Sequence, residues 1–333
     1  MVRAPDRRAS IPGGKPVPQH GSARGTVPAQ QPSVTAPRRV LPNATLLVTR
    51  RCSERRFFFR PSPAKNELFL YTLASAAAKF EVQIHAFCLL SNHFHGVLTD
   101  LNGVLPAFEQ YLDSLVARAF NALLGRWESF WAPGSFSAVT LSTPEAVLDK
   151  MAYVLANPVT AGLVRRGSEW PGLWSDPSTI GGPPIEVSRP KGFFRERDDG
   201  PMKPTVKLRI DPPPVREAVE AFRHRLAGEV KRREDQAARE LAAEGRSFLG
   251  VRKVLAQNER SAPTSGEPRR GLNPRVAEPD KWKRIEALER LKDFLEAYRS
   301  AWKEFANGAR NVLFPHGTYW MRVAYGMPCA ASG

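Results

Sequence analysis

The sequence predicts an α+β fold in which an antiparallel sheet packs against helices, followed by a mostly α-helical C-terminal extension. Residues 82–98 form two β-rich runs on either side of a Ser-Asn turn, which predicts a hairpin. Amphipathic helical patterns flank that hairpin, and longer, more charged ones follow towards the C-terminus. We divide the chain of 333 residues into a basic disordered tail (1–40), the α+β domain (41–180), a proline-rich linker (181–214) and a basic helical region (215–333).

Residues 1–40 contain seven prolines and four glycines without apolar periodicity, so they are expected to be disordered. A short β-rich run follows at residues 45–49, ahead of a cluster of arginines. Residues 66–79 favour a helix with Asn66 as its cap, and residues 82–90 and 93–98 favour the paired strands. Residues 105–124 then have the pattern of an amphipathic helix.

Residues 142–164 predict another helix. Ser142 and Glu145 form a capping box with a proline in the first turn, and apolar residues follow on one face. Asn157 precedes Pro158 and is expected to end or kink this helix, because a residue before proline avoids the α region. The prolines after Trp174 predict the linker, and residues 215–243 and 280–305 predict the two long charged helices. Gly245 and residues 248–255 between them are compatible with a helix-turn-helix or with any helical hairpin.

The composition, with 42% apolar and 25% charged residues, suits a folded domain and is too polar for a membrane protein. No run approaches the roughly 18 apolar residues of a spanning helix, and the first residues lack the apolar core of a secretory signal. Three cysteines without a CxxC pair argue against a disulfide scaffold or a cysteine-bound zinc site. We therefore expect a cytoplasmic protein.

The net charge of +16 indicates a polyanionic partner. Its distribution is uneven: residues 1–40 carry +6, residues 41–180 carry +1 and residues 181–333 carry +9. The flanks, above all the C-terminal region, are therefore expected to supply most of the binding affinity for that partner. The sequence contains no P-loop, no GxGxxG motif and no recognisable carboxylate triad for two-metal catalysis.

His93 and His95 are two residues apart on a predicted strand, so both imidazoles point to one face while Phe94 points to the other. Two neutral imidazoles side by side form half of a metal site. The alternative is a pair of histidines on a solvated strand. Three of the six histidines, His85 included, fall in this hairpin.

Tyr153 and Asn157 are four residues apart, which places them on one face of the predicted helix. The pair taken alone is better explained by a packed aromatic ring one turn before a helix-ending Asn-Pro.

Taken together, the two pairs resemble a known family. Residues 86–95 read AFCLLSNHFH, and about 58 residues separate the last histidine from a run that begins at Tyr153 and reads YVLANPVTAGLV. This order and spacing resemble the HUH-class single-tyrosine transposases, in particular the REP-associated tyrosine transposase branch. The resemblance covers roughly residues 41–178 and implies an HUH endonuclease (ferredoxin-like) core.

The resemblance implies that Tyr153 is the nucleophile and that His93, His95 and Asn157 hold one Mg²⁺ or Mn²⁺ ion. It further implies cleavage and rejoining of single-stranded or hairpin DNA through a 5′-phosphotyrosine intermediate. The two imidazoles and one amide, judged by ligand chemistry alone, would suit a transition metal. The sequence departs from the family pattern at Ser91, at Thr160 and over residues 130–136, but not at these four residues.

Two alternatives stay open at this stage. One is a domesticated HUH nickase without a mobile element, and the other is a non-catalytic DNA-binding regulator on the same scaffold. The oligomeric state, monomer or homodimer, is also open. The candidate contacts to DNA phosphates are the basic residues Arg50, Arg51, Lys150, Arg165, Arg166, Lys231, Arg232 and Arg233.

Overall fold

The computed structural model describes residues 37–134, 136–194, 200, 202–264 and 274–331. Its main element is a five-stranded sheet with the order β2-β3-β1-β4-β7, antiparallel except for the parallel pair β4-β7. The predicted class, an α+β fold with an antiparallel sheet packed against helices, is confirmed. The strands are β1 (Ala44–Arg51), β2 (Val82–Leu90), β3 (His93–Asp100), β4 (Ser137–Leu141) and β7 (Val276–Ala277).

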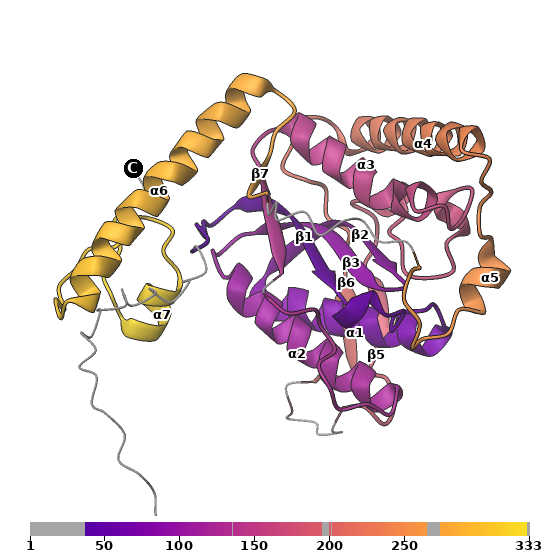
Figure 1. Cartoon of the computed structure of the whole chain (residues 1–333), viewed down its shortest axis with the longest axis horizontal. Coiled ribbons are helices and arrows are strands. Elements are labelled where there is room, and N and C mark those ends of the chain that lie inside the picture. The colour runs from indigo at the N-terminus through magenta and orange to yellow at the C-terminus, as the bar shows by residue number, and fades with distance from the viewer. Residues whose placement is uncertain (1–36, 135, 195–199, 201, 265–273, 332–333) are drawn as a thin grey trace, which may run out of the picture. The chain divides into compact units, whose positions relative to one another are not determined.

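Helices cover both faces of this sheet. Phe94 of β3 packs against Phe69 with ring centroids 5.0 Å apart, whereas His95, the next residue, faces Tyr153. Because neighbouring side chains of a strand point to opposite faces, the helix of Phe69 and the helix of Tyr153 lie on opposite sides (Figure 1). These helices are α1 (Pro63–Phe80), with α2 (Leu105–Leu123) beside it, and α3 (Pro144–Thr160) on the other face.

The core on the α1 side is built around aromatic rings. Phe59, which is 1% exposed, has four neighbouring rings with centroids within 5.6 Å. Burying one such side chain contributes about 1.5–3 kcal/mol, so this cluster anchors α1 and α2 to the sheet. The four neighbours are Phe69, Phe120, Phe130 and Trp131.

The start and the end of α3 differ from the sequence prediction. The cap is Thr143, whose hydroxyl accepts from the Ala146 amide at 3.2 Å, so the expected capping role of Ser142 is wrong. The helix does not end at Asn157 but continues through Pro158 to Thr160. The carbonyl of Pro158 accepts from the Leu163 amide at 3.0 Å, which closes the last turn.

Residues 181–214, the predicted proline-rich linker, contain regular structure where they are described. They contain a two-stranded hairpin, β5 (Ile185–Ser188) and β6 (Thr205–Leu208), which contacts α1. The Asp211 amide then donates to the Ile84 carbonyl at 2.7 Å, which ties the end of the segment to β2. Prolines limit backbone pairing but not burial, so a proline-rich segment can still pack against folded elements.

The helices after residue 214 are α4 (Val219–Ala243), α5 (Val251–Leu255), α6 (Lys281–Ala306) and α7 (Trp320–Tyr325). α4 packs on α3, and the amides of Leu249 and Gly250 donate to the carbonyls of Gly162 and Leu163, both at 2.9 Å. None of the helices in the described ranges is long and apolar enough to cross a membrane. Most of the expected disordered tail, residues 1–36, lies outside the described residues.

Candidate active site

The imidazoles of His93 and His95 lie on the face of the sheet that α3 covers. Their ring centroids are 4.6 Å apart, with the ring planes at 90°. The register of the sheet places Arg51 of β1 opposite His93 and Thr49 opposite His95. The site is therefore built on two paired strands, which are rigid elements that hold side chains in fixed positions.

The Nδ1 atom of each imidazole has an oxygen partner. His93 Nδ1 lies 2.6 Å from Asn92 Oδ1, and His95 Nδ1 lies 2.7 Å from Thr49 Oγ1. An amide oxygen only accepts, so His93 Nδ1 carries the proton, and the same tautomer at His95 lets Nδ1 donate to Thr49. Nε2 of both rings then presents a lone pair, the arrangement found in metal-ligating histidines.

Both imidazoles are held neutral. Burial, together with the charges of His95, Arg51 and Arg55, holds the pKa of His93 well below its ordinary value. Burial and the charge of Arg51 lower the pKa of His95 to about 3. A neutral imidazole is the form that binds a metal ion, so these two rings are suited to that role at neutral pH.

Tyr153 of α3 lies next to this pair. Its ring centroid is 5.4 Å from that of His95, and 36% of the residue is exposed. Asn157, one helical turn later, is 7% exposed, and within the described residues no hydrogen bond involves its side-chain amide. The structure thus brings Tyr153 and the two histidines together, with Asn157 buried on the following turn of the same helix.

The donor set fits a divalent cation only in part. Two imidazole nitrogens are present, but across the described ranges no group of three or more His, Cys, Asp or Glu residues has metal-binding geometry. Two imidazoles and an amide oxygen leave the remaining positions of a Mg²⁺ or Mn²⁺ ion to water or substrate oxygens, which both ions accept.

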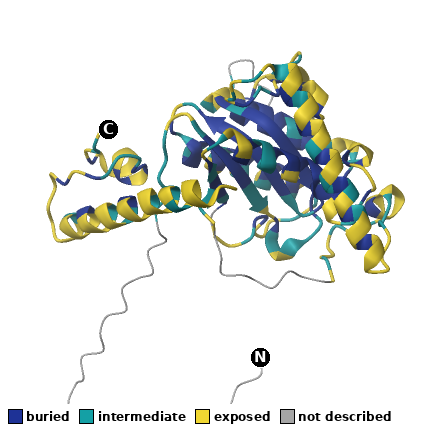
Figure 2. Cartoon of the chain, turned by 90° about the horizontal axis from the view of Figure 1, so that it is seen from above, coloured by how far each residue is buried: buried dark blue, intermediate teal, exposed yellow. Residues whose placement is uncertain are grey.

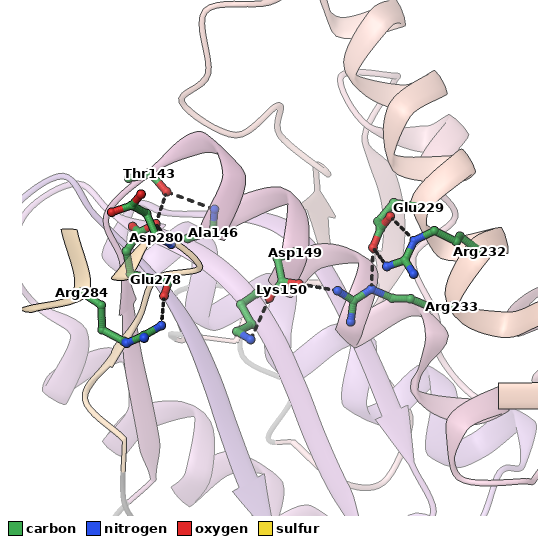
Figure 3. Close-up of polar contacts among 10 residues, drawn as sticks. All are labelled: Thr143, Ala146, Asp149, Lys150, Glu229, Arg232, Arg233, Glu278, Asp280 and Arg284. Atoms are coloured by element: carbon green, nitrogen blue, oxygen red, sulfur yellow. Dashed lines mark hydrogen bonds and ion pairs between the residues drawn. The ribbon is translucent and has the colours of Figure 1, made fainter. Parts of the chain in front are cut away.

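Lys150 extends the site along α3. Its Nζ lies 5.9 Å from the centroid of the Tyr153 ring and 2.8 Å from Asp149 Oδ2. The other oxygen of Asp149 is paired with Arg233 of α4, which also binds Glu229 at 3.0 Å (Figure 3). A line of alternating charges therefore runs from α4 to the ammonium group beside Tyr153.

A second polar contact fixes the start of α3. The Thr143 hydroxyl lies 3.0 Å from Glu278 Oε1, in the segment that leads from β7 into α6 (Figure 3). The helix that carries Tyr153 is thus held at its first turn and at its middle by side chains from after residue 215.

The other basic residues predicted to contact DNA are placed differently. Arg50 is 13% exposed, pairs with Asp113 at 2.8 Å and donates to two backbone carbonyls, so its charge is used inside the fold. Arg51 is exposed at the end of β1, next to the histidines, and Arg165 is exposed after α3.

The basic run on α4 and its neighbour Arg166 are occupied by acidic partners. Lys231 and Arg166 both pair with Asp235, at 2.6 and 2.7 Å, and hold the pKa of that carboxyl well below its ordinary value. Arg232 pairs with Glu229 at 2.6 Å. Much of the positive charge on this helix is therefore neutralised locally.

Three residues that support the site were not singled out from the sequence as site residues. Thr49 binds His95. Asn92 binds His93 with its oxygen and donates to the Arg55 carbonyl from its nitrogen at 3.2 Å. Arg55 has a left-handed backbone, φ 58°, and its charge acts on His93. Only the strand register could have revealed Thr49, whereas Asn92 directly precedes the histidine motif.

His85, the third histidine of the hairpin, belongs to the core. Its Nδ1 donates to the Asp211 carbonyl at 2.9 Å, and its Nε2 accepts from the Thr99 hydroxyl at 2.8 Å. Thr99 Oγ1 in turn lies 2.8 Å from Thr45 Oγ1. Both ring nitrogens are satisfied, so His85 is a structural residue.

Comparisons with known proteins add little to this geometry. No protein-family model matches the chain, and no curated protein matches it. Among solved structures, the chain is similar to a REP-associated tyrosine transposase bound to a REP hairpin, at 17% identity and a TM-score of 0.35. The similarity covers 40% of this chain and 78% of that one.

Proposed function

We propose that this protein cuts and rejoins single-stranded DNA through a covalent bond between Tyr153 and the DNA. The observation that carries the proposal is the phenol ring of Tyr153 at 5.4 Å from His95, beside two neutral imidazoles whose Nε2 atoms are available as ligands. The sequence motifs around these residues, which resemble the HUH-class tyrosine transposases, give the same assignment.

His93 and His95, with Asn157 as the third candidate, would hold one Mg²⁺ or Mn²⁺ ion. Such an ion supplies charge stabilisation at the non-bridging oxygens of the scissile phosphate. The chain's own contribution is to keep both imidazoles neutral and to fix their orientation through Thr49 and Asn92.

In the cleavage step, the Tyr153 oxygen attacks the phosphorus. The phenol loses its proton, an O–P bond forms, and the bond from phosphorus to the 3′ oxygen breaks. The leaving 3′ oxygen takes up a proton, and the DNA 5′ end stays on Tyr153 as a phosphotyrosine. A phosphodiester is exchanged for a phosphodiester, so attack by another 3′-OH reverses the step without ATP.

In this proposal Lys150 assists the cleavage step. Its ammonium group lies on the same side of α3 as the phenol, 5.9 Å from the ring centroid, and is held there by Asp149. A positive charge near the attacking oxygen favours its ionised form and also attracts the phosphate.

The test is the covalent adduct itself. Full-length protein is incubated with labelled single-stranded hairpin DNA and Mn²⁺, and the products are separated on a denaturing protein gel. We expect a labelled protein band that is lost in Tyr153→Phe and in excess chelator. Tyr111→Phe, which removes a hydroxyl located on α2, is the matched control and should retain the band. An adduct of undiminished yield in Tyr153→Phe would contradict the proposal, and absence of any adduct would favour a binding regulator.

A further inference from the structure

Residues 299–331 form a lobe with its own small apolar core, called the C-terminal lobe below. The ring of Phe305 on α6 lies 5.6 Å from that of Tyr325 on α7, and Tyr298 lies 5.5 Å from Phe314. These contacts join the last turns of α6 to the chain that returns along it. The buried residues of this core are Ala301, Val312, Phe314, Met321 and Met327.

Large aromatic side chains stay outside that core. Trp302 is 39% exposed, Trp320 is 54% exposed and Tyr325 is 62% exposed. Figure 2 shows α6, the helix that carries Trp302, as exposed along most of its length. Exposed aromatic rings gathered on one small unit indicate a surface with a binding partner.

The charge of the lobe indicates the chemistry of that partner. Residues 299–331 contain the basic side chains Arg299, Lys303, Arg310 and Arg322 but a single carboxylate, Glu304. Within the described residues none of the four forms an ion pair, and Arg310 instead lies over the Phe305 ring at 5.2 Å. The basic run of α4, by contrast, is paired with acids.

We propose that the C-terminal lobe is a second binding surface for single-stranded DNA. Bases stack on Trp302, Trp320 and Tyr325, and phosphates contact the unpaired arginines and lysine. Aromatic platforms interleaved with cations bind single strands in this way, because every base offers a ring face and every nucleotide a negative charge. The identity of the strand as DNA rests on the proposed function.

The exposed rings and the unpaired charges argue against two other binding partners, a DNA duplex and a second copy of the chain. A duplex keeps its bases stacked inside, so it would use the cations but not the rings. A second copy of the chain would cover the rings, yet it would bring the same unpaired positive charges to the interface, which is unfavourable.

The experiment measures the binding of labelled oligothymidylate, which forms no hairpin, by fluorescence anisotropy. Full-length protein carrying Tyr153→Phe is used, so that no covalent product forms. Trp320→Leu keeps an apolar side chain and removes the ring, whereas Trp320→Phe keeps a ring. We expect Trp320→Leu to weaken binding about tenfold and Trp320→Phe to bind nearly as tightly as the parent. Trp127→Leu, which removes an 88% exposed indole outside the lobe, is the matched control and should bind normally.

Equal affinity of Trp320→Leu and the parent would overturn the proposal, and so would an equal loss in Trp127→Leu. Self-association of the parent in sedimentation that is lost in a Trp320→Ser variant would assign the surface to a protein contact instead. A duplex of the same length that binds as tightly as the single strand, and that loses the same affinity in Trp320→Leu, would contradict the proposal that bases stack on these rings. This assay needs no catalysis, so failure of the adduct assay alone would leave a DNA-binding lobe on a non-cleaving protein.

Discussion

The ring of Tyr153 on α3 lies 5.4 Å from the ring of His95 on β3, although 58 residues separate them in the chain. Their contact depends on how α3 is held on the sheet. Thr143 binds Glu278, and Asp149 binds Arg233, so two elements from the C-terminal half fix this helix. The position of the proposed nucleophile is therefore set partly by residues outside the segment that carries the motifs.

The hydroxyl of Thr49 is expected to orient His95 for metal binding. Thr49→Val keeps the shape of the side chain and removes the 2.7 Å partner of Nδ1, so the ring loses its fixed tautomer. Loss of such a supporting bond typically costs 10–100-fold in metal affinity, and we expect the Kd for Mn²⁺ in calorimetry to rise by about tenfold.

The matched control for this prediction is Thr45→Val, the same change in the same strand. The Thr45 hydroxyl binds Thr99 and not a site histidine, so its loss should leave Mn²⁺ affinity unchanged. Equal Kd values for wild type and Thr49→Val would show that the hydroxyl does not orient the ligand.

The ammonium group of Lys150 is expected to speed formation of the adduct. The ammonium group lies 5.9 Å from the centroid of the Tyr153 ring, and stabilisation of the ionised oxygen by about 1.4 kcal/mol corresponds to a factor of about ten in rate. We expect Lys150→Met to slow adduct formation about tenfold in a single-turnover assay and Lys150→Arg to retain most of the rate. A Lys150→Met variant as fast as wild type would remove Lys150 from the mechanism.

The sequence was sufficient to predict the parts of this fold that depend on local patterns. The hairpin of β2 and β3 and the helix over residues 105–124 follow from alternation and periodicity. The cap predicted at Asn66 is wrong, because α1 begins at Pro63 and Ser62 caps it. The strand period also placed Phe94 on the face opposite the histidines, as observed.

The parts that depend on distant contacts were not predicted. β7 has only two residues and exists because it pairs with β4, so no local pattern marks it. Whether a cation on α4 is free or paired depends on which acid lies one turn away or on a neighbouring helix. The same holds for Arg50, whose partner Asp113 is 63 residues away. Charge counts along the sequence cannot separate these cases.

His85 makes the stability of the fold dependent on pH. Burial lowers its pKa to about 4, against an ordinary value of 6.5, and outweighs the hydrogen bond to the Asp211 carbonyl, which acts in the opposite direction. Between these two pH values the unfolded state binds a proton that the folded state does not. The free energy of unfolding therefore falls as the pH falls from about 6.5 to about 4, by up to about 3 kcal/mol in total.

Urea denaturation of wild type and His85→Asn at several pH values checks this prediction. The variant should be less stable at pH 7, because a buried hydrogen-bond pair is altered, but its stability should fall less between pH 6.5 and pH 4. Parallel curves for the two proteins would show that other groups cause the acid sensitivity.

The two basic clusters of the C-terminal half should differ in how they contribute to DNA binding. On α4, Lys231 and Arg232 are paired with Asp235 and Glu229, whereas Arg299 and Lys303 in the C-terminal lobe have no ion pair within the described ranges. Only a cation that neutralises a phosphate releases a counterion. For single strands each such contact contributes about 0.7 to the steepness of log K against log salt concentration. The double change Arg299→Gln/Lys303→Gln should therefore reduce the slope by about 1.4, and Lys231→Gln/Arg232→Gln should change it much less. Anisotropy titrations of both variants over a salt series measure the two slopes. The reverse order would assign the phosphate contacts to α4, as the basic run in the sequence suggests.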